Sequence, residues 1–265
     1  MRLHNRFQGG KEILEVIPAL PKAKDRFVTM VDDHKLRSEM VRVDISTLTP
    51  EQAIGKPDRQ DFALLGGKEV MIEAQFKQHF GQAFTNQPQN FNGILDDVLN
   101  LNLDTINNRA IFVATMNAVC SYLGIIGKVR HCRNQEPEDC GKKIADQLIS
   151  QYSKIKIGMV GYQPAILENL VKRFSVENTT CSDLDTRNIG ENKFGVTILD
   201  GSTENRNLIG WCDLLLATGS THVNDTFDDL YREAISQNKP FVIFGVTGAS
   251  IVALLRLDII CPLAR

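Results

Sequence analysis

The segment HCRNQEPEDC, residues 131–140, brings together side chains that bind soft metal ions. His131 and Cys132 are adjacent, Cys140 ends the segment, and carboxylates lie between them. An imidazole and two thiols could take zinc, iron or copper. The spacing is not that of a zinc finger and no second paired motif follows, so a closed four-ligand site would need a donor from elsewhere. The alternative interpretation, favoured by the base rate for isolated Cys pairs, is two free thiols beside an acidic helix start.

Three short apolar runs end in turns that combine glycine with hydroxyl and amide groups. These turns are GYQP at 161–164, TGSTHVN at 218–224 and GVTGAS at 245–250. Ligands of open parallel sheets bind beyond the carboxyl ends of the strands. We therefore expect the three turns to lie along one edge and to hold an anionic or highly polar small molecule. The predicted ligand contacts are Gly161, Tyr162, Gln163, Asp185, Thr218, Gly219, Ser220, Thr221, Asn224, Gly245, Thr247 and Gly248.

His222 lies in the second of these turns, among polar residues. It is the candidate catalytic residue, as a general acid or base, although a metal ligand or an exposed imidazole fits the same pattern. The dinucleotide fingerprint G-x-G-x-x-G is absent, because Gly158 and Gly161 form only G-x-x-G, so an NAD-type site is disfavoured. Asp183 and Asp185 nevertheless stand where nucleotide-binding folds hold a ribose hydroxyl, unless they simply end a strand.

Alternating helices and strands, which begin at residue 136, must position these side chains. The pattern predicts helices over 136–152, 164–174 and 225–238, and strands over 154–161, 178–185, 195–201, 212–219, 240–248 and 257–263. Near-continuous apolar strands that alternate with helices indicate an α/β fold, with a mostly parallel sheet and helices on both faces.

The first part of the chain has shorter elements and indicates a smaller α+β unit. Its pattern predicts a strand at 25–31, a helical turn at 49–55, a hairpin of 68–76 and 81–85, and a short helix at 90–101. A longer helix is expected at 104–124, with Asp104 as its cap and Asn117 on its apolar face. A buried amide needs partners, so we interpret Asn117 as a structural hydrogen-bonding residue between elements. The alternative is an amide that points into a cleft.

The composition is that of a soluble globular protein, with 43% hydrophobic and 23% charged residues in a chain of 265. The formal net charge of −2 creates no basic field, so neither nucleic acid nor a membrane surface is expected as a partner. No long uncharged apolar run and no secretory signal are recognisable, which predicts a cytoplasmic protein. There, the six Cys residues would be free thiols, ligands or nucleophiles rather than disulfides.

Several of these stretches resemble a known family. IGMVGYQPAILENL, CDLLLATGSTHVNDTFDDLY and FVIFGVTGAS look like the putative heavy-metal chelation domain, a domain of unknown function, and the T-G-S-T-x-x-N-x-T-x-D-x-L run at 218–230 is the most specific match. The segments at 54–74 and 109–124 resemble the enolase N-terminal-like domain that precedes it in this family. The resemblance implies an enolase N-terminal-like domain at 1–130, a Rossmann-like domain at 131–265, and a binding site in the cleft between them with a role in metal handling.

Two functions follow from these observations. The first is a binding protein that holds a metal ion, or a metal-carrying anionic small molecule, with His131, Cys132 and Cys140 as metal ligands. The second is an enzyme that acts on a nucleotide-like or pterin-like compound in the same cleft, with His222 as acid or base and Cys140 as nucleophile. A scaffold with a vestigial cleft is a weaker third hypothesis. The sequence leaves the identity of the ligand and the oligomeric state open, and a homo-oligomer is compatible with it.

Overall fold

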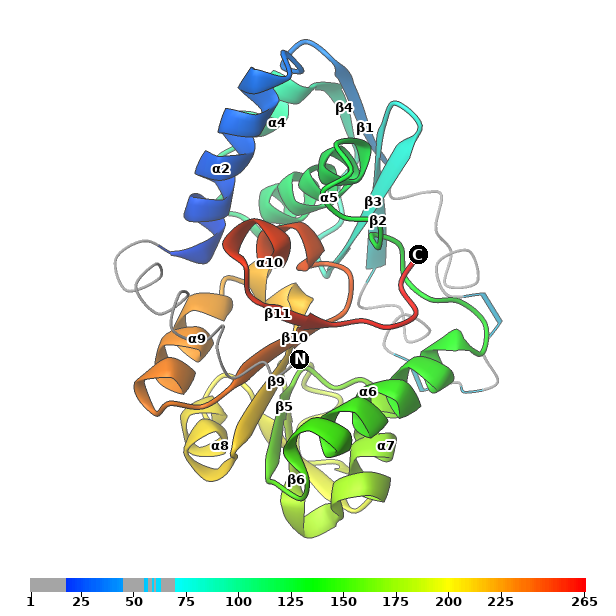
Figure 1. The fold of residues 1–265 in the computed structure, drawn as a ribbon, viewed down its shortest axis with the longest axis vertical. Helices are drawn as coiled ribbons and strands as arrows, with labels where there is room; N and C mark the ends of the chain where they lie inside the picture. Colours follow the sequence, from blue (N-terminus) through cyan, green and yellow to red (C-terminus); the bar gives the residue numbers. More distant parts are fainter. Residues whose placement is uncertain (1–17, 45–54, 57–58, 60, 63–69) are drawn as a thin grey trace.

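The computed structural model describes residues 18–44, 55–56, 59, 61–62 and 70–265, which form two parts (Figure 1). The N-terminal part, at the top of the figure, contains a four-stranded sheet, and the C-terminal part below it contains a seven-stranded sheet. The helical turn predicted at 49–55 lies outside the described residues except for its last position, as does much of the segment 54–74. The enolase-like character of the first part and the boundary after residue 130 therefore stay predictions.

The N-terminal sheet is antiparallel throughout, with the strand order β3-β2-β1-β4. Its elements are α2 (Ala19–Asp33), β1 (Met40–Asp44), β2 (Val70–Phe76), β3 (His79–Thr85), β4 (Phe91–Ile94), α4 (Leu95–Leu99) and α5 (Ile106–Tyr122). The predicted hairpin is confirmed, because β2 and β3 pair along their whole length. The smaller α+β unit predicted for this part of the chain is confirmed as well.

The local predictions were wrong in two places. The strand expected at 25–31 lies inside α2, because Ala23, Phe27 and Val31 recur every four residues and bury one helical face. This packing outweighs the preference of the segment's side chains for a strand. The helix expected at 90–101 divides into β4 and the short helix α4. The long predicted helix is confirmed as α5, although its N-cap residue is Thr105 rather than Asp104.

Asn117 in the middle of α5 connects the two parts of the molecule. It is fully buried, and its Nδ2 donates to the carbonyl oxygen of Gln82 at 2.9 Å. Nδ2 also lies 3.2 Å from each of the carbonyl oxygens of Val246 and Thr247. Its Oδ1 accepts hydrogen bonds from the backbone N–H and the hydroxyl of Ser250, at 3.0 and 2.5 Å. The interpretation of this amide as a structural link between elements is confirmed.

The C-terminal part alternates helices and strands as predicted, although α8, α10 and the short strand β7 were not among the predicted elements. Its helices are α6 (Glu136–Tyr152), α7 (Pro164–Phe174), α8 (Asn205–Trp211), α9 (Phe227–Ser236) and α10 (Ala249–Leu255), with short 3₁₀ turns η3 (Val176–Asn178) and η4 (Gly219–His222). Its strands are β5 (Ile157–Val160), β6 (Thr179–Asp183), β7 (Asn192–Lys193), β8 (Val196–Asp200), β9 (Leu214–Thr218), β10 (Phe241–Phe244) and β11 (Asp258–Ile260). The fold class is confirmed as α/β.

The strand order of this second sheet is β11-β10-β9-β5-β6-β8-β7. All neighbouring strands are parallel except β7, which pairs antiparallel with β8. From β8 to β11 the chain order runs third, second, first, fourth, fifth, sixth, which is the order of doubly wound dinucleotide-binding folds. The order reverses between β5 and β9, so the chain leaves these two strands toward opposite faces and opens a crevice at their carboxyl ends.

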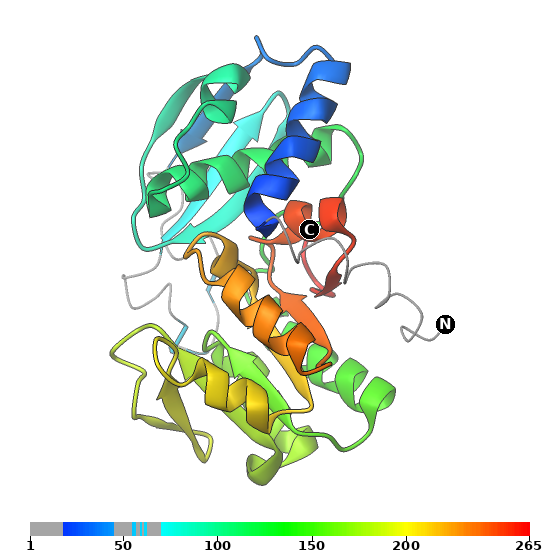
Figure 2. The same cartoon turned by 90° about the vertical axis from the view of Figure 1, so that its left-hand side faces the viewer.

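Two hydrophobic cores cover the two faces of this sheet. Helices α6 and α7 bury one face with residues such as Leu148 and Leu170. Helices α8 and α9 lie on the other face, whose core continues without interruption into α2 and α5 of the N-terminal part. Figures 1 and 2 show α10 at the boundary, where it packs against both of these N-terminal helices. The two parts therefore share apolar packing as well as the Asn117 hydrogen bonds.

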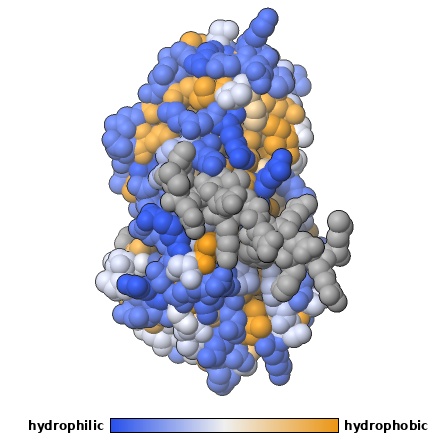
Figure 3. All heavy atoms as spheres, turned by 60° about the vertical axis from the view of Figure 1, so that its left-hand side comes forward, coloured by the Kyte–Doolittle hydropathy of each residue, from blue (hydrophilic) through white to orange (hydrophobic). Residues whose placement is uncertain are grey.

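The face seen in Figure 3 is mainly hydrophilic, with smaller hydrophobic patches between the charged and polar residues. Within the described part of the chain, no helix has the length and apolar character needed to cross a bilayer.

His222 belongs to the shared core, so the alternative of an exposed imidazole is wrong. It ends η4, is only 2% exposed, and stacks on Phe227 with ring centroids 4.1 Å apart. Its Nδ1 lies 3.2 Å from the carbonyl oxygen of Gly219. Burial lowers the pKa of His222 to about 4, so the ring is neutral at physiological pH. Its surroundings are those of a core residue, and its role as the catalytic residue stays a prediction.

Replacement of Asn117 by Ala should destabilise the protein by about 3 kcal/mol or more, because buried backbone and hydroxyl groups from both parts lose their partner. Urea denaturation measures this change. Asn207→Ala, at an exposed position of α8, is the control and should change the free energy of unfolding by less than about 0.5 kcal/mol. Equal effects of the two substitutions would contradict the role of Asn117.

Acid should weaken folding through His222. Its pKa is about 4 in the folded protein and about 6.5 in the unfolded chain, so the unfolded chain binds the extra proton between these values. The contribution of neutral His222 to the free energy of unfolding is fully present above about pH 6.5. It falls by about 3 kcal/mol as the pH drops to about 4. Urea denaturation at pH 7.5 and pH 5 should show a larger loss for the wild type than for His222→Phe. The same loss in both would show that another group controls this pH dependence.

Candidate functional site

A pocket of about 440 Å³ lies between the two parts of the molecule, at the crevice where the strand order reverses. The N-terminal part contributes Phe62, Phe84, Thr85, Asn86 and Ile106 to its wall. The rest of the lining comes from the C-terminal part, mostly from residues that directly follow β5, β6, β9 and β10. The volume is in the range of pockets that enclose a small organic molecule.

The structure brings most of the predicted site residues to this one pocket. The predicted ligand contacts that line it are Gly161, Tyr162, Gln163, Asp185, Thr218, Ser220, Thr221, Asn224, Gly245 and Thr247. The predicted metal ligands His131, Cys132 and Cys140 line it as well. Gly219, His222 and Gly248 do not appear in its wall. The two glycines contact each other instead, since a Cβ on Gly219 would lie 2.4 Å from the backbone nitrogen of Gly248.

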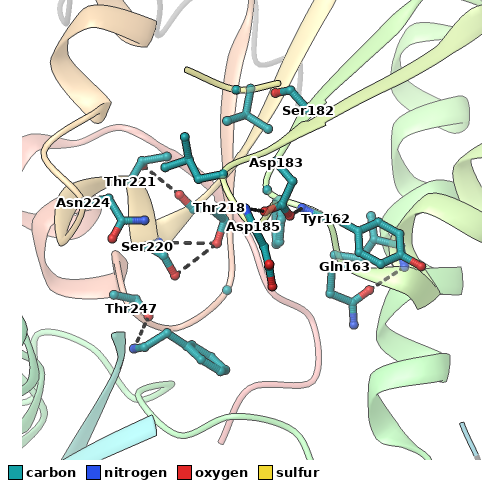
Figure 4. Close-up of a pocket in the computed structure, with 18 of the residues that line it drawn as sticks. Tyr162, Gln163, Ser182, Asp183, Asp185, Thr218, Ser220, Thr221, Asn224 and Thr247 are labelled. Carbon is teal, nitrogen blue, oxygen red and sulfur yellow. Dashed lines mark hydrogen bonds between the residues drawn. The ribbon is translucent and has the colours of Figure 1, made fainter. Parts of the chain in front are cut away.

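The hydroxyl-rich turn after β9 forms one wall. Figure 4 shows Thr218, Ser220, Thr221 and Asn224 together on one side of the pocket, opposite Tyr162 and Gln163. Within the turn, the hydroxyl of Thr221 donates to the carbonyl oxygen of Thr218 at 2.8 Å. These groups offer both donors and acceptors to a polar ligand.

The turn after β5 forms the opposite wall and begins helix α7. Gly161 has a φ of +90°, a conformation that favours glycine, and a Cβ there would lie 2.5 Å from Cγ2 of Thr218. Gln163 is the N-cap of α7, and its Oε1 accepts a hydrogen bond from the backbone N–H of Ile166 at 2.6 Å. Pro164 follows in the first turn and has no N–H to offer. The start of this helix is therefore already capped by the protein itself.

Two carboxylates lie between these walls, at the end of β6 (Figure 4). The carboxylate of Asp183 accepts hydrogen bonds from the backbone N–H groups of Tyr162 and Asp185, each at 2.6 Å. Burial raises the pKa of Asp183, and these hydrogen bonds oppose that rise. Asp185 forms an ion pair with Arg187 at 2.5 Å. Both carboxylates are thus held in place by neighbouring groups.

Three thiols meet at another part of the wall. Cys140 in the first part of α6 interacts with Cys132, which precedes the helix, and with Cys261, which directly follows β11. All three line the pocket. Hydrogen bonds from Cys132 and Cys261 lower the pKa of the Cys140 thiol, whereas the same interactions raise the pKa values of the two donors. The arrangement favours one thiolate that is stabilised by two neutral thiols.

His131 is next to this thiol cluster. Its Nδ1 lies 3.7 Å from the sulfur of Cys132 and 2.7 Å from the carbonyl oxygen of the same residue. Its backbone N–H donates to Oε1 of Gln82 in β3 at 2.7 Å, which ties it to the N-terminal part. Burial lowers the pKa of His131, so its ring is neutral at physiological pH and can act as a ligand.

The thiols and the imidazole are the side-chain types that bind soft metal ions, but their present arrangement does not form a metal site. Thiolate and neutral imidazole are ligands of zinc, copper and heavier metals. Among the described residues, however, no group of three or more His, Cys, Asp or Glu side chains is arranged to hold a metal ion. Metal binding here would require rotation of the Cys and His side chains toward a common point.

Cys261 was missed as a candidate ligand by the sequence analysis. The sequence feature that could have identified Cys261 is its position directly after the apolar run LDII, because the carboxyl ends of all parallel strands reach the same edge of a sheet. The clustering of Cys261 with Cys140 depends on the position of β11 at the end of the sheet, which local sequence does not reveal.

The electrostatic character of the pocket differs from the expected one. Among the described residues of its wall there is no Lys or Arg. Arg59, near Phe62, uses its charge in ion pairs with Glu138 of α6 and Glu168 of α7 and lies over the ring of Phe194. The described wall therefore contains two carboxylates, one of which is paired with Arg187 outside the wall, and no cationic side chain of its own.

Comparison with known proteins identifies the C-terminal part. Residues 143–259 match the family model described as DUF364, putative heavy-metal chelation. None of the curated proteins is significantly similar to the chain. The chain is similar to a solved DUF364 protein of unknown function from Pyrococcus horikoshii, with 19% identity, a TM-score of 0.49, and 87% of this chain and 80% of that chain covered. It is also similar to a DUF364 protein of unknown function from Desulfitobacterium hafniense, with 13% identity, a TM-score of 0.43, and coverage of 66% and 68%. The part of the chain that matches this family model, residues 143–259, also supplies most of the wall of the pocket.

Proposed function

We propose that this protein binds a soft metal ion, alone or carried by a small molecule, in the pocket between its two parts. The observation that carries the proposal is the thiol cluster of Cys132, Cys140 and Cys261 in the wall of that pocket. The description of the family as one of heavy-metal chelation supports the same chemistry. A cytoplasmic location is part of the proposal, because free thiols persist in a reducing compartment.

The residues that would hold the metal are the three thiols together with the imidazole of His131. Thiolates are strong ligands for soft ions, and a ligand set that includes three of them discriminates against magnesium and calcium, which prefer oxygen. Cys132 and Cys140 come from one connecting segment, and Cys261 comes from the other end of the domain. Binding would therefore clamp the end of β11 to the start of α6.

The remaining wall supplies a second recognition surface. The hydroxyl and amide groups of Ser220, Thr221 and Asn224 lie in the same pocket as the thiols. A metal ion with no organic partner needs no such polar surface. We therefore propose that the natural ligand includes an organic part that these groups bind.

Titration with Cd²⁺ tests the metal site through the ultraviolet charge-transfer absorption of cadmium thiolates. The wild type should show this absorption, and Cys140→Ser and Cys261→Ser should each weaken Cd²⁺ binding by at least about tenfold, because each removes one of three thiolate ligands. Cys261 is only partly buried, so the second substitution carries little risk for folding.

Cys212→Ser is the matched control, because Cys212 is buried outside the pocket wall. It should bind Cd²⁺ as the wild type does. Absence of thiolate absorption in the wild type, or unchanged affinity in both pocket variants, would refute the proposed metal site.

A further inference from the structure

We infer that the tip of β6 in this pocket binds the ribose and base of a nucleoside, and that the ligand carries no phosphate group. The inference shares the pocket of the proposed function but needs neither the thiols nor a metal ion. It is carried by three features of the described wall: an acidic strand end, an exposed apolar side chain beside it, and the lack of Lys and Arg near a helix start that Gln163 caps.

The acidic strand end lies beside the reversal of strand order. In doubly wound sheets with this order, the acid at the end of the second strand accepts hydrogen bonds from ribose hydroxyls. Here β6 is the second strand, and Asp183 and Asp185 stand at its end in the wall of the pocket. Each carboxylate has room for about four hydrogen bonds, so acceptor sites remain on Asp183 beyond the two backbone N–H groups that orient it.

Leu184 provides an apolar surface between the two acids. It lines the pocket and is 47% exposed. Gly201, which follows β8, lies next to it, and a Cβ on this glycine would lie 3.5 Å from Cδ2 of Leu184. A flat nucleobase that stacks on Leu184 would cover its exposed apolar surface.

The helix start that holds the phosphates in dinucleotide-binding folds is capped by a side chain of the protein itself. The side-chain oxygen of Gln163 accepts a hydrogen bond from the backbone N–H of Ile166, and its backbone carbonyl oxygen accepts one from the N–H of Leu167. Pro164 has no N–H. The bulky Tyr162 stands where those folds have a glycine-rich turn. With the two carboxylates and no Lys or Arg in the described wall, a phosphate there would be repelled.

Binding of the four common ribonucleosides, their 2′-deoxy forms and their 5′-monophosphates tests the inference by isothermal titration calorimetry. At least one of adenosine, guanosine, cytidine and uridine should bind. Its 2′-deoxy form should bind about tenfold more weakly through the loss of a hydroxyl contact, and its 5′-monophosphate at least about tenfold more weakly through repulsion. These comparisons change only the ligand, so they do not depend on whether a variant folds.

Asp185→Asn should reduce the difference in affinity between the ribonucleoside and its 2′-deoxy form. Asp229→Asn, on the exposed face of α9, should leave this difference unchanged. Cys140→Ser should bind the nucleoside as the wild type does, so failure of the metal site and failure of the nucleoside site are distinguishable. The inference is overturned if no ribonucleoside binds, if the monophosphate binds as tightly as its nucleoside, or if Asp185→Asn leaves the ribose preference intact.

Discussion

The arrangement of the pocket depends on one buried amide. Asn117 of α5 binds the carbonyl oxygens and the N–H that follow β10, so the turn at 245–250 is held against the N-terminal part. The same turn contains Thr247, whose hydroxyl accepts a hydrogen bond from the backbone N–H of Phe84 at 3.1 Å. Because a buried amide is costly unless all its hydrogen bonds are made, only a narrow range of relative positions satisfies both parts. The pocket is the space that remains between them.

This constraint explains why the pocket has two chemically different regions. The thiols come from the segment that links the two parts and from the end of the last strand, whereas the hydroxyl and carboxylate groups follow the central strands. The first region offers soft donors, and the second offers hydrogen-bonding groups around an exposed leucine. A ligand that joins a metal to a polar organic group, or two ligands that meet in the pocket, would use both regions.

The absence of cationic side chains from the described wall separates this pocket from most sites at the same position of the same sheet. Anions at the edge of such a sheet are normally held by a free helix start and by Lys or Arg. Here Gln163 caps the helix start and Arg59 is engaged with Glu138 and Glu168. The general topology is thus compatible with a nucleotide site, but the described wall offers a phosphate no cationic side chain.

The amino-acid sequence by itself determined the alternation of helices and strands from residue 136, the parallel sheet and the gathering of three turns at one edge, since apolar periodicity is local and the carboxyl ends of parallel strands must share an edge. It also determined that Asn117 needed partners. Only the tertiary structure decided that the thiols share the pocket with those turns, that Cys261 joins them, and that His222 is buried against Phe227. These outcomes depend on contacts between residues far apart in the chain, and the energy of packing and desolvation that selects them does not appear in any local pattern.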